Sequence, residues 1–150
     1  SAVFHSEKEI IHIVGYGIVL RSNDGGNTWE KKDIFGDFFR AIHFPSSNVG
    51  YAVGQSGSII KTIDAGKHWK FIRNGDAIST SNKSFRSVFF IDEEHGYVVG
   101  HDGLFWRTKN GGANWETMPD LPEVDLHDIF IRDRKGFIVG KKGKIFSFQL

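Results

Sequence analysis

The chain has 150 residues, enough for one domain with a hydrophobic core, and its 19 basic and 18 acidic side chains give a formal net charge of +1. This balance excludes a strong overall attraction to nucleic acid or to an anionic membrane surface. Cysteine is absent, which excludes disulfides and thiolate metal ligands. No apolar run approaches the roughly 20 residues that span a bilayer.

A repeat organises the chain. The pattern hydroxyl, any, Asp or Asn, any, Gly, any, any, Trp occurs three times, with 40 and then 46 residues between successive tryptophans. An apolar-apolar-Gly triplet marks the same period four times, ending at Gly15, Gly54, Gly100 and Gly140. The sequence therefore predicts four units, with boundaries near residues 1–36, 37–80, 81–122 and 123–150.

Each unit contains short alternating segments that predict antiparallel strands. In the first unit these are residues 1–4, 10–15, 17–22 and 28–32, and in the second 39–44, 50–54, 58–62 and 68–73. The third has 85–90, 96–100, 103–108 and 114–118 after a connecting loop at 75–84. The fourth has 126–131, 136–140 and 144–147, after which Ser147 and Gln149 are expected at the hydroxyl and Asp places of an unfinished turn.

Four-stranded antiparallel units of this length, with a Gly and Trp signature, predict an all-β fold of the β-propeller type. A β-sandwich is the alternative, but it gives no reason for the recurring turn. The fourth unit is expected to lack its outer strand, as in propellers whose last blade receives that strand from the other end of the chain. We therefore expect the C-terminal part of a longer propeller, and self-association through its open blade edges.

The residue types of the repeated motif are those that stabilise a tight turn. Asp or Asn accepts hydrogen bonds from nearby backbone N–H groups, Gly takes positive φ, and Trp packs the turn onto the layer below. Asn110 keeps the acceptor oxygen, so the third turn should stay intact, and Trp29→Ala or Trp69→Ala should destabilise a blade severely. The structural positions are Ser22, Asp24, Gly26 and Trp29; Thr62, Asp64, Gly66 and Trp69; and Thr108, Asn110, Gly112 and Trp115.

This turn resembles the Asp-box, or bacterial neuraminidase repeat, of sialidases, xyloglucan-degrading hydrolases, sortilin-like receptors and photosystem II assembly/stability factors. The last family is most similar, because its repeats combine the box with strands such as Phe-Arg-Ser-Val at 85–88 and Gly-Tyr-Val-Val-Gly at 96–100. The resemblance implies that the box is structural and lies on the outer hairpin. It also implies a non-enzymatic scaffold that binds a protein partner through an axial face, in an extracytoplasmic (periplasmic, secreted or lumenal) location.

A candidate binding site lies at the start of the first strands. Arg40, Arg86 and His127 occupy equivalent places there, just before the apolar part of each strand. The first strands of propeller blades surround the axis, so we expect these side chains to converge at one axial mouth. Guanidinium groups suit a carboxylate, a phosphate or an acidic partner segment. The alternative is that the three side chains pair with nearby acids or lie in solvated loops.

The alternative function is a fragment of an Asp-box glycoside hydrolase (sialidase- or xyloglucanase-like) or a carbohydrate-binding propeller. A glycosidase needs two carboxyl groups about 5 to 9.5 Å apart across its substrate. Acidic residues here lie mostly in turns without a repeated pair: Asp37, Asp92, Glu93, Glu94, Asp102, Asp125 and Asp128.

The remaining polar residues favour no further chemistry. The seven histidines lack metal-ligand spacing, and His12, His43 and His68 are expected to be partly exposed strand residues. Residues 141–144, Lys-Lys-Gly-Lys, are interpreted as a solvated hairpin turn. We expect no catalytic residue, metal, cofactor or nucleic-acid partner.

Overall fold

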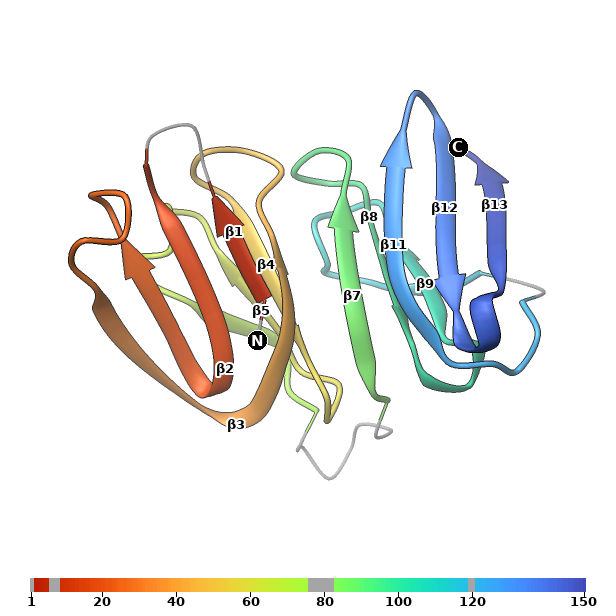
Figure 1. Cartoon of the computed structure of the whole chain (residues 1–150), viewed down its shortest axis with the longest axis horizontal. Coiled ribbons are helices and arrows are strands. Elements are labelled where there is room, and N and C mark those ends of the chain that lie inside the picture. Colours follow the sequence, from red (N-terminus) through yellow and green to blue (C-terminus); the bar gives the residue numbers. More distant parts are fainter. Residues whose placement is uncertain (1, 6–8, 76–82, 119–120) are drawn as a thin grey trace.

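The computed structural model describes residues 2–5, 9–75, 83–118 and 121–150, which form antiparallel sheets (Figure 1). The sheet orders are β1-β2-β3-β4-β5-β6, β10-β9-β8-β7 and β11-β12-β13. The elements are β1 (Ala2–His5), β2 (Ile11–Ser22), β3 (Glu30–His43), β4 (Gly50–Gly54), β5 (Ile59–Thr62), β6 (Lys70–Arg73), β7 (Phe85–Phe90), β8 (Gly96–Gly100), η1 (His101–Gly103), β9 (Phe105–Thr108), β10 (Glu116–Thr117), β11 (Leu126–Arg132), β12 (Lys135–Gly140), η2 (Lys141–Gly143) and β13 (Ile145–Gln149).

Four blades make up these sheets. Blade 1 is β1, β2 and the start of β3; blade 2 is the rest of β3 with β4, β5 and β6; blade 3 is β7 to β10; and blade 4 is β11 to β13. Blade 4 has three strands, so the prediction of an all-β propeller fragment whose last unit lacks its outer strand is confirmed. No helix in the part of the chain that the structure describes is long and apolar enough to cross a membrane.

Blade 1 has tighter connections than expected. The segments expected at 10–15 and 17–22 are joined in the one element β2, whose ribbon turns back on itself near its middle (Figure 1), so that its first half pairs with β1 and its second half pairs with β3. The cause is a shorter connection, since Gly15 and Gly17 are two residues apart where Gly54 and Gly57 are three apart. Strand β3 likewise continues through the expected boundary at residue 36, where Gly36 bends it with a φ of 117°. Most of the loop expected at 75–84 lies outside the described residues.

The C-terminal strand does not begin a fourth copy of the turn, so that expectation is wrong. In the antiparallel register, Gly50 faces Thr62, Gly96 faces Thr108, and Gly136 faces Phe148. Phe148 therefore occupies the hydroxyl position, and Ser147 lies one residue before it.

A packing substitution explains this difference. In blades 2 and 3 an aromatic ring from the inner strand, Phe44 or Phe90, fills the space beside the facing glycine. In blade 4 the equivalent inner-strand residue is Ile131, which is smaller. The ring of Phe148 lies against Gly136 instead, so the aromatic group comes from the third strand.

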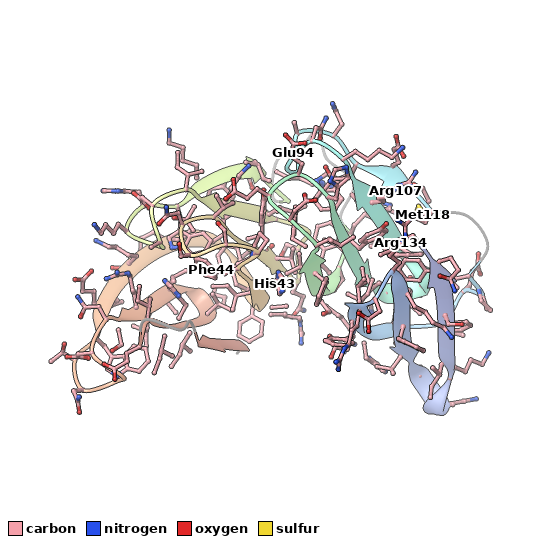
Figure 2. The ribbon with its side chains drawn as sticks, turned by 90° about the horizontal axis from the view of Figure 1, so that it is seen from above. His43, Phe44, Glu94, Arg107, Met118 and Arg134 are labelled. Carbon is pink, nitrogen blue, oxygen red and sulfur yellow. The ribbon has the colours of Figure 1, made fainter. Side chains whose placement is uncertain are left out.

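The core lies between the blades rather than within them. Side chains of neighbouring blades form three successive clusters, between blades 1 and 2, 2 and 3, and 3 and 4. Between blades 2 and 3, for example, the rings of Tyr51 and Phe90 stack with centroids 3.6 Å apart and planes 3° apart. Viewed from above, the four blades form an open arc with blade 1 at one end and blade 4 at the other (Figure 2).

Candidate binding site at the axial mouth

The Asp-box turns are closed by their own side chains. In the second box, Gly66 N–H donates to the Thr62 hydroxyl (3.0 Å), which donates to Asp64 Oδ1 (2.8 Å). The same carboxylate oxygen accepts from the His68 backbone N–H (2.9 Å), and Trp69 Nε1 donates to the Gly66 carbonyl (3.2 Å). These bonds satisfy the turn internally, which supports a structural role for the box.

The first box repeats this arrangement, and the third keeps the bonds of the turn, although Trp115 Nε1 has no hydrogen-bond partner among the described residues. In the first, Thr28 hydroxyl donates to Asp24 Oδ2 (2.6 Å), and hydrogen bonds from Thr28 lower the pKa of Asp24 to about 2. In the third, Asn110 Oδ1 accepts from the Asn114 backbone N–H (2.9 Å) and from the Thr108 hydroxyl (3.1 Å). The amide therefore keeps the turn closed, as predicted.

The second and third boxes also bind side chains of the preceding blade, a role that the sequence pattern did not indicate. His12 Nε2 and Arg21 Nε of blade 1 lie 3.1 and 2.9 Å from the carbonyl oxygen of Ala65 in the second box. At the equivalent places of blade 2, Tyr51 hydroxyl and Lys61 Nζ donate to Gly111 O in the third box, at 3.4 and 3.3 Å. The box is therefore also an inter-blade docking point.

His12 is not a partly exposed strand residue, which corrects the expectation from sequence. It is 1% exposed, and its ring stacks on Phe44 with centroids 4.4 Å apart. Burial, reinforced by the nearby Arg21 charge, lowers the pKa of His12 to about 4, although the Ala65 carbonyl opposes the shift. Burial also lowers the pKa of His43 to about 4, whereas His68 is exposed on the second box.

Acidification should therefore destabilise the fold between about pH 6.5 and pH 4. In that range His12 is neutral in the folded state and protonated in the unfolded state, so stability is lost as pH falls. A depression of this size contributes on the order of 3 kcal/mol for one buried histidine. Urea unfolding across this pH range measures the loss. His12→Tyr, which copies Tyr51, should lose less stability than the wild type, and equal losses in both proteins would contradict this assignment.

The three residues predicted to form the axial mouth share one backbone feature. Each is the extra residue of a β-bulge between the first two strands of its blade. Arg40 lies between the pairs Phe39–Gly54 and Ala41–Val53, and Arg86 and His127 lie at the same register position in blades 3 and 4. A bulge leaves its extra residue unpaired and redirects its side chain.

These bulges lie at the same end of three neighbouring inner strands. Strand β7 packs against both β3 and β11 (Figure 1). Ser87, next to Arg86, donates its hydroxyl to Asp128 Oδ1 of the adjacent strand at 2.6 Å. Further along the same strands, the rings of His43 and Phe89 lie 4.5 Å apart. The fold therefore gathers the three predicted residues at one axial end.

The two arginines at the mouth have donors that the described residues leave unused. Arg40 Nη2 donates to Gln55 Oε1, and its guanidinium lies over the Phe38 ring, 5.2 Å from the centroid. The Nε atoms of Arg40 and Arg86 are buried and have no hydrogen-bond partner among the described residues. A buried unpaired donor costs free energy.

Three further residues of the mouth were missed from the sequence. Gln55, His101 and Lys141 each follow an apolar-apolar-Gly triplet, and that position was the available signal. The backbone N–H of each donates, at 2.8 to 3.1 Å, to the backbone carbonyl oxygen of the residue two places before the bulge residue. These acceptors are Phe38, Ser84 and Asp125, respectively. The turn after the second strand is thereby fixed beside the bulge residue in blades 2, 3 and 4.

Among the carboxylates near the mouth, Asp125 lies beside two of its basic side chains. Asp125 lies 3.5 Å from His101 Nδ1 and 3.9 Å from Lys141 Nζ. The Asp102 backbone N–H and then the His101, Lys141 and Arg86 side chains lower the pKa of Asp125. The alternative interpretation, pairing with nearby acids, thus applies in part to Arg86.

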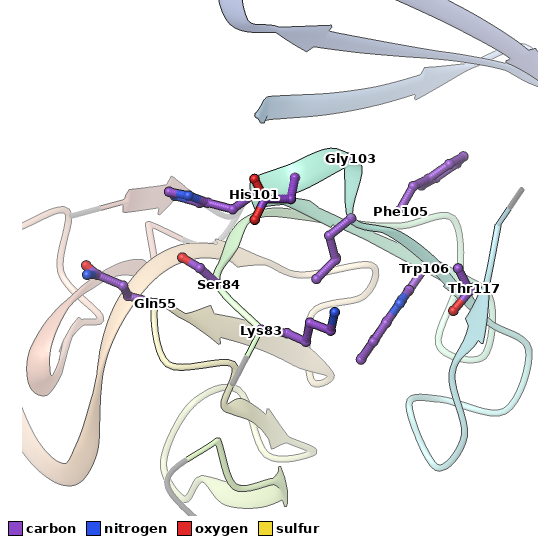
Figure 3. A pocket seen from close by; sticks show the side chains of 10 residues that line it. Gln55, Lys83, Ser84, His101, Gly103, Phe105, Trp106 and Thr117 are labelled. Atoms are coloured by element: carbon purple, nitrogen blue, oxygen red, sulfur yellow. The ribbon is translucent and has the colours of Figure 1, made fainter. Parts of the chain in front are cut away.

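A pocket of about 600 Å³ opens beside the mouth between blades 2 and 3. Figure 3 shows Gln55, Ser84 and His101 on one side of it and Trp106 and Thr117 on the other. The pocket thus adds an apolar wall next to the polar residues of the mouth.

The carboxylates near the mouth serve the fold. Asp37 is 6% exposed and accepts from the backbone N–H groups of Phe38, Ser56 and Ser58 at 2.7 to 2.9 Å. Asp128 accepts from Ser87, and Asp125 has the basic neighbours given above. Within the described ranges, no three His, Asp or Glu side chains come together as a metal-ligand set.

Comparison with known proteins shows which family and which solved structures the chain is similar to. The profile of the family described as Photosynthesis system II assembly factor YCF48 matches residues 34–125. No curated protein matches the sequence.

Solved structures share the fold. YCF48 bound to D1 peptide has a TM-score of 0.76 and 20% identity, over 99% of this chain and 50% of that chain. YCF48 from Cyanidioschyzon merolae gives 0.75 and 19%, over 98% and 52%. The GH74 enzyme of Niastella koreensis gives 0.77 and 13%, over 99% and 28%. The chain thus spans about half the length of the two YCF48 structures. Since the family profile covers more than half of its residues, the chain belongs to the family of the photosystem II assembly factor YCF48.

Proposed function

We propose that this chain is a non-enzymatic scaffold that holds an acidic segment of a protein partner at the axial mouth. The observation that carries the proposal is the set of equivalent bulges at Arg40, Arg86 and His127, on one end of three neighbouring strands. A YCF48 protein has been solved with a D1 peptide bound, which supports a protein partner for a member of this family.

The chemistry of the mouth favours a carboxylate ligand. A guanidinium offers parallel N–H donors that match the two oxygens of a carboxylate, and such charge-assisted bonds are stronger than neutral ones. Lys141 adds positive charge at the same end, while Asp125 offsets part of it. An acidic segment fits this balance better than a basic or purely apolar one.

Membership of the family supports a finer proposal for the partner. We propose that the partner segment belongs to a membrane complex during its assembly and that binding takes place outside the cytoplasm. The GH74 likeness, at 13% identity, concerns the fold alone. A glycoside hydrolase function is not proposed, because the carboxylates near the mouth serve the fold.

Binding should depend on the two arginines. With a fluorescently labelled D1 peptide as the probe, we expect the wild-type chain to bind, and Arg40→Glu with Arg86→Glu to weaken binding at least about 100-fold, since each lost charged contact costs about 1.5 to 3 kcal/mol. Fluorescence anisotropy gives the two dissociation constants, and circular dichroism checks that the variant folds.

The matched control is Lys67→Glu with Lys70→Glu. Both lysines are exposed on or next to the second box, and the substitution changes the net charge by the same amount. This control should bind the peptide within about threefold of the wild type, because long-range charge effects are screened by salt. Equal loss in both double variants would contradict a site at the mouth, as would a wild-type chain that does not bind.

A further inference from the structure

An exposed group of aromatic side chains lies where blades 1 and 2 meet. Tyr16 is 82% exposed and Phe35 is 79% exposed, the two highest values among the large hydrophobic side chains of the described residues. Phe38 is half-buried, and its ring centroid lies 6.5 Å from that of Tyr16. We refer to Tyr16, Phe35 and Phe38 as the aromatic cluster. Large aromatic groups that are open to water commonly mark a binding surface.

The repeat places Tyr16 at a position of the axial mouth. Tyr16 follows the triplet that ends at Gly15, just as Gln55, His101 and Lys141 follow the three later triplets. Blade 1 thus has an aromatic side chain where the other blades have a polar or basic one. The turn within β2, the bend of β3 and the start of β7 lie at the same end of the molecule (Figure 1). The aromatic cluster is therefore part of the mouth.

Exposure at this position also occurs where both neighbouring blades are present. Phe35 and Phe38 lie on the part of β3 that connects blade 1 to blade 2, and both of these blades are described. Gln55 has the same turn position as Tyr16 and is exposed, although blades 1 and 3 flank its own blade. The exposure therefore belongs to the axial end of the fold.

Phe38 connects the aromatic cluster to the basic side of the mouth. It pairs with Tyr16 in the sheet, and its carbonyl oxygen accepts from the Gln55 backbone N–H at 2.9 Å. The Arg40 guanidinium lies over its ring, 5.2 Å from the centroid. Paired strands rather than a long loop thus carry these side chains, with Gly17 at a φ of 60° in the turn. The apolar and the basic surfaces are therefore continuous.

A pocket of about 290 Å³ opens within the cluster, and its lining includes all three aromatic residues together with Gly36 and Ser56. This volume lies below the range of roughly 300 to 1,000 Å³ that is usual for separate small ligands, so the pocket suits one side chain of a longer ligand. Asp37 also lines it. Its oxygens already accept from three backbone N–H groups, which leaves little capacity for the hydroxyl groups of a sugar.

We propose that the aromatic cluster holds an apolar side chain of the same partner segment whose carboxylates bind Arg40 and Arg86. This inference rests on the proposed function and adds the class of ligand, namely a segment in which an aromatic or other large apolar residue lies next to acidic ones. Aromatic side chains are common anchors of protein interfaces, because they bury a large area at a small entropic cost. The apolar residue lies toward blades 1 and 2, and the acidic residues lie toward blades 2 and 3.

Binding of the labelled D1 peptide tests the cluster. Tyr16→Ser with Phe35→Ser should weaken binding at least about tenfold, the usual effect of losing the burial of a large apolar side chain. The matched control is Ile63→Ser with Ile91→Ser, which replaces side chains that are 72 and 44% exposed outside the mouth. This control should bind within about threefold of the wild type, because substitutions away from an interface have small effects. Circular dichroism checks that both variants fold.

The outcomes separate this inference from the proposed function. Unchanged affinity in the cluster variant, while Arg40→Glu with Arg86→Glu still loses binding, would overturn the inference and leave the proposed function intact. A wild-type chain that does not bind the peptide would overturn both.

A serine scan of the apolar residues of the peptide tests for direct contact. At least one serine peptide should bind the wild-type chain more weakly and lose nothing further against the cluster variant, because groups in contact are not additive. Additive losses for every serine peptide would contradict the contact.

A spectroscopic signal reports the same contact at one residue. The chain has three tyrosines, and Tyr51 and Tyr97 are at most 5% exposed. In a fluorotyrosine-labelled chain, the fluorine resonance that Tyr16→Phe removes should shift when the D1 peptide binds, and the other two should stay in place. An unmoved Tyr16 resonance at saturation would overturn the inference. A shift with a neutral glucan oligosaccharide but not with the peptide would assign the cluster to carbohydrate, and would overturn it as well.

Discussion

Phe90→Ala should lower the free energy of unfolding by about 3 to 5 kcal/mol, the usual cost of removing a fully buried aromatic ring. Phe90 is 1% exposed and stacks on Tyr51 of the preceding blade at 3.6 Å. The Trp115 ring meets it edge-on at 6.1 Å, and its own ring fills the space beside Gly96. Its loss would open a cavity between blades 2 and 3, where neighbours from both blades cannot close in fully.

The control for this substitution is Phe35→Ala. Phe35 is 79% exposed, so its removal should cost less than about 1 kcal/mol. Guanidinium unfolding of both variants gives the comparison. Similar stabilities for Phe90→Ala and Phe35→Ala would mean that the blades are not held together by this inter-blade core.

Trp69→Ala should be the second large effect, at about 3 to 5 kcal/mol, whereas Trp29→Ala should cost about 1 kcal/mol. Both indoles donate to a box glycine carbonyl, at 3.2 Å for Trp69 and 3.0 Å for Trp29. The two variants therefore lose the same kind of hydrogen bond, and they differ in the packing that they lose. Trp69 in addition packs edge-on against Phe44 at 5.9 Å, whereas Trp29 is 39% exposed. The structure therefore limits the severe effect expected from sequence to the box that has a preceding blade.

Thermal or urea unfolding of the two alanine variants measures both losses. Equal losses would show that the box tryptophans act only within their own turns.

The repeat made most of the fold predictable. The turn pattern and the apolar-apolar-Gly triplet located the strands of blades 2, 3 and 4, and the same alignment placed Arg40, Arg86 and His127 at equivalent positions. That alignment did not show that all three are bulge residues, because a bulge depends on the register of two strands.

The error at the C-terminal strand arose where packing overrides pattern, because a change from an aromatic residue to Ile131 moves the ring to Phe148. His12 looked like an ordinary strand residue, because its buried contact is with Ala65, 53 positions away. Contacts between blades of this kind have no local signal in the sequence.

Hydrogen exchange with and without bound D1 peptide tests the proposed mouth most directly. Protection should appear at the bulges around Arg40, Arg86 and His127, and at the turns that begin with Gln55, His101 and Lys141. The Asp-box turns at 22–29, 62–69 and 108–115 should be unchanged. Protection confined to those turns, or absent from the three bulges, would contradict binding at the axial mouth.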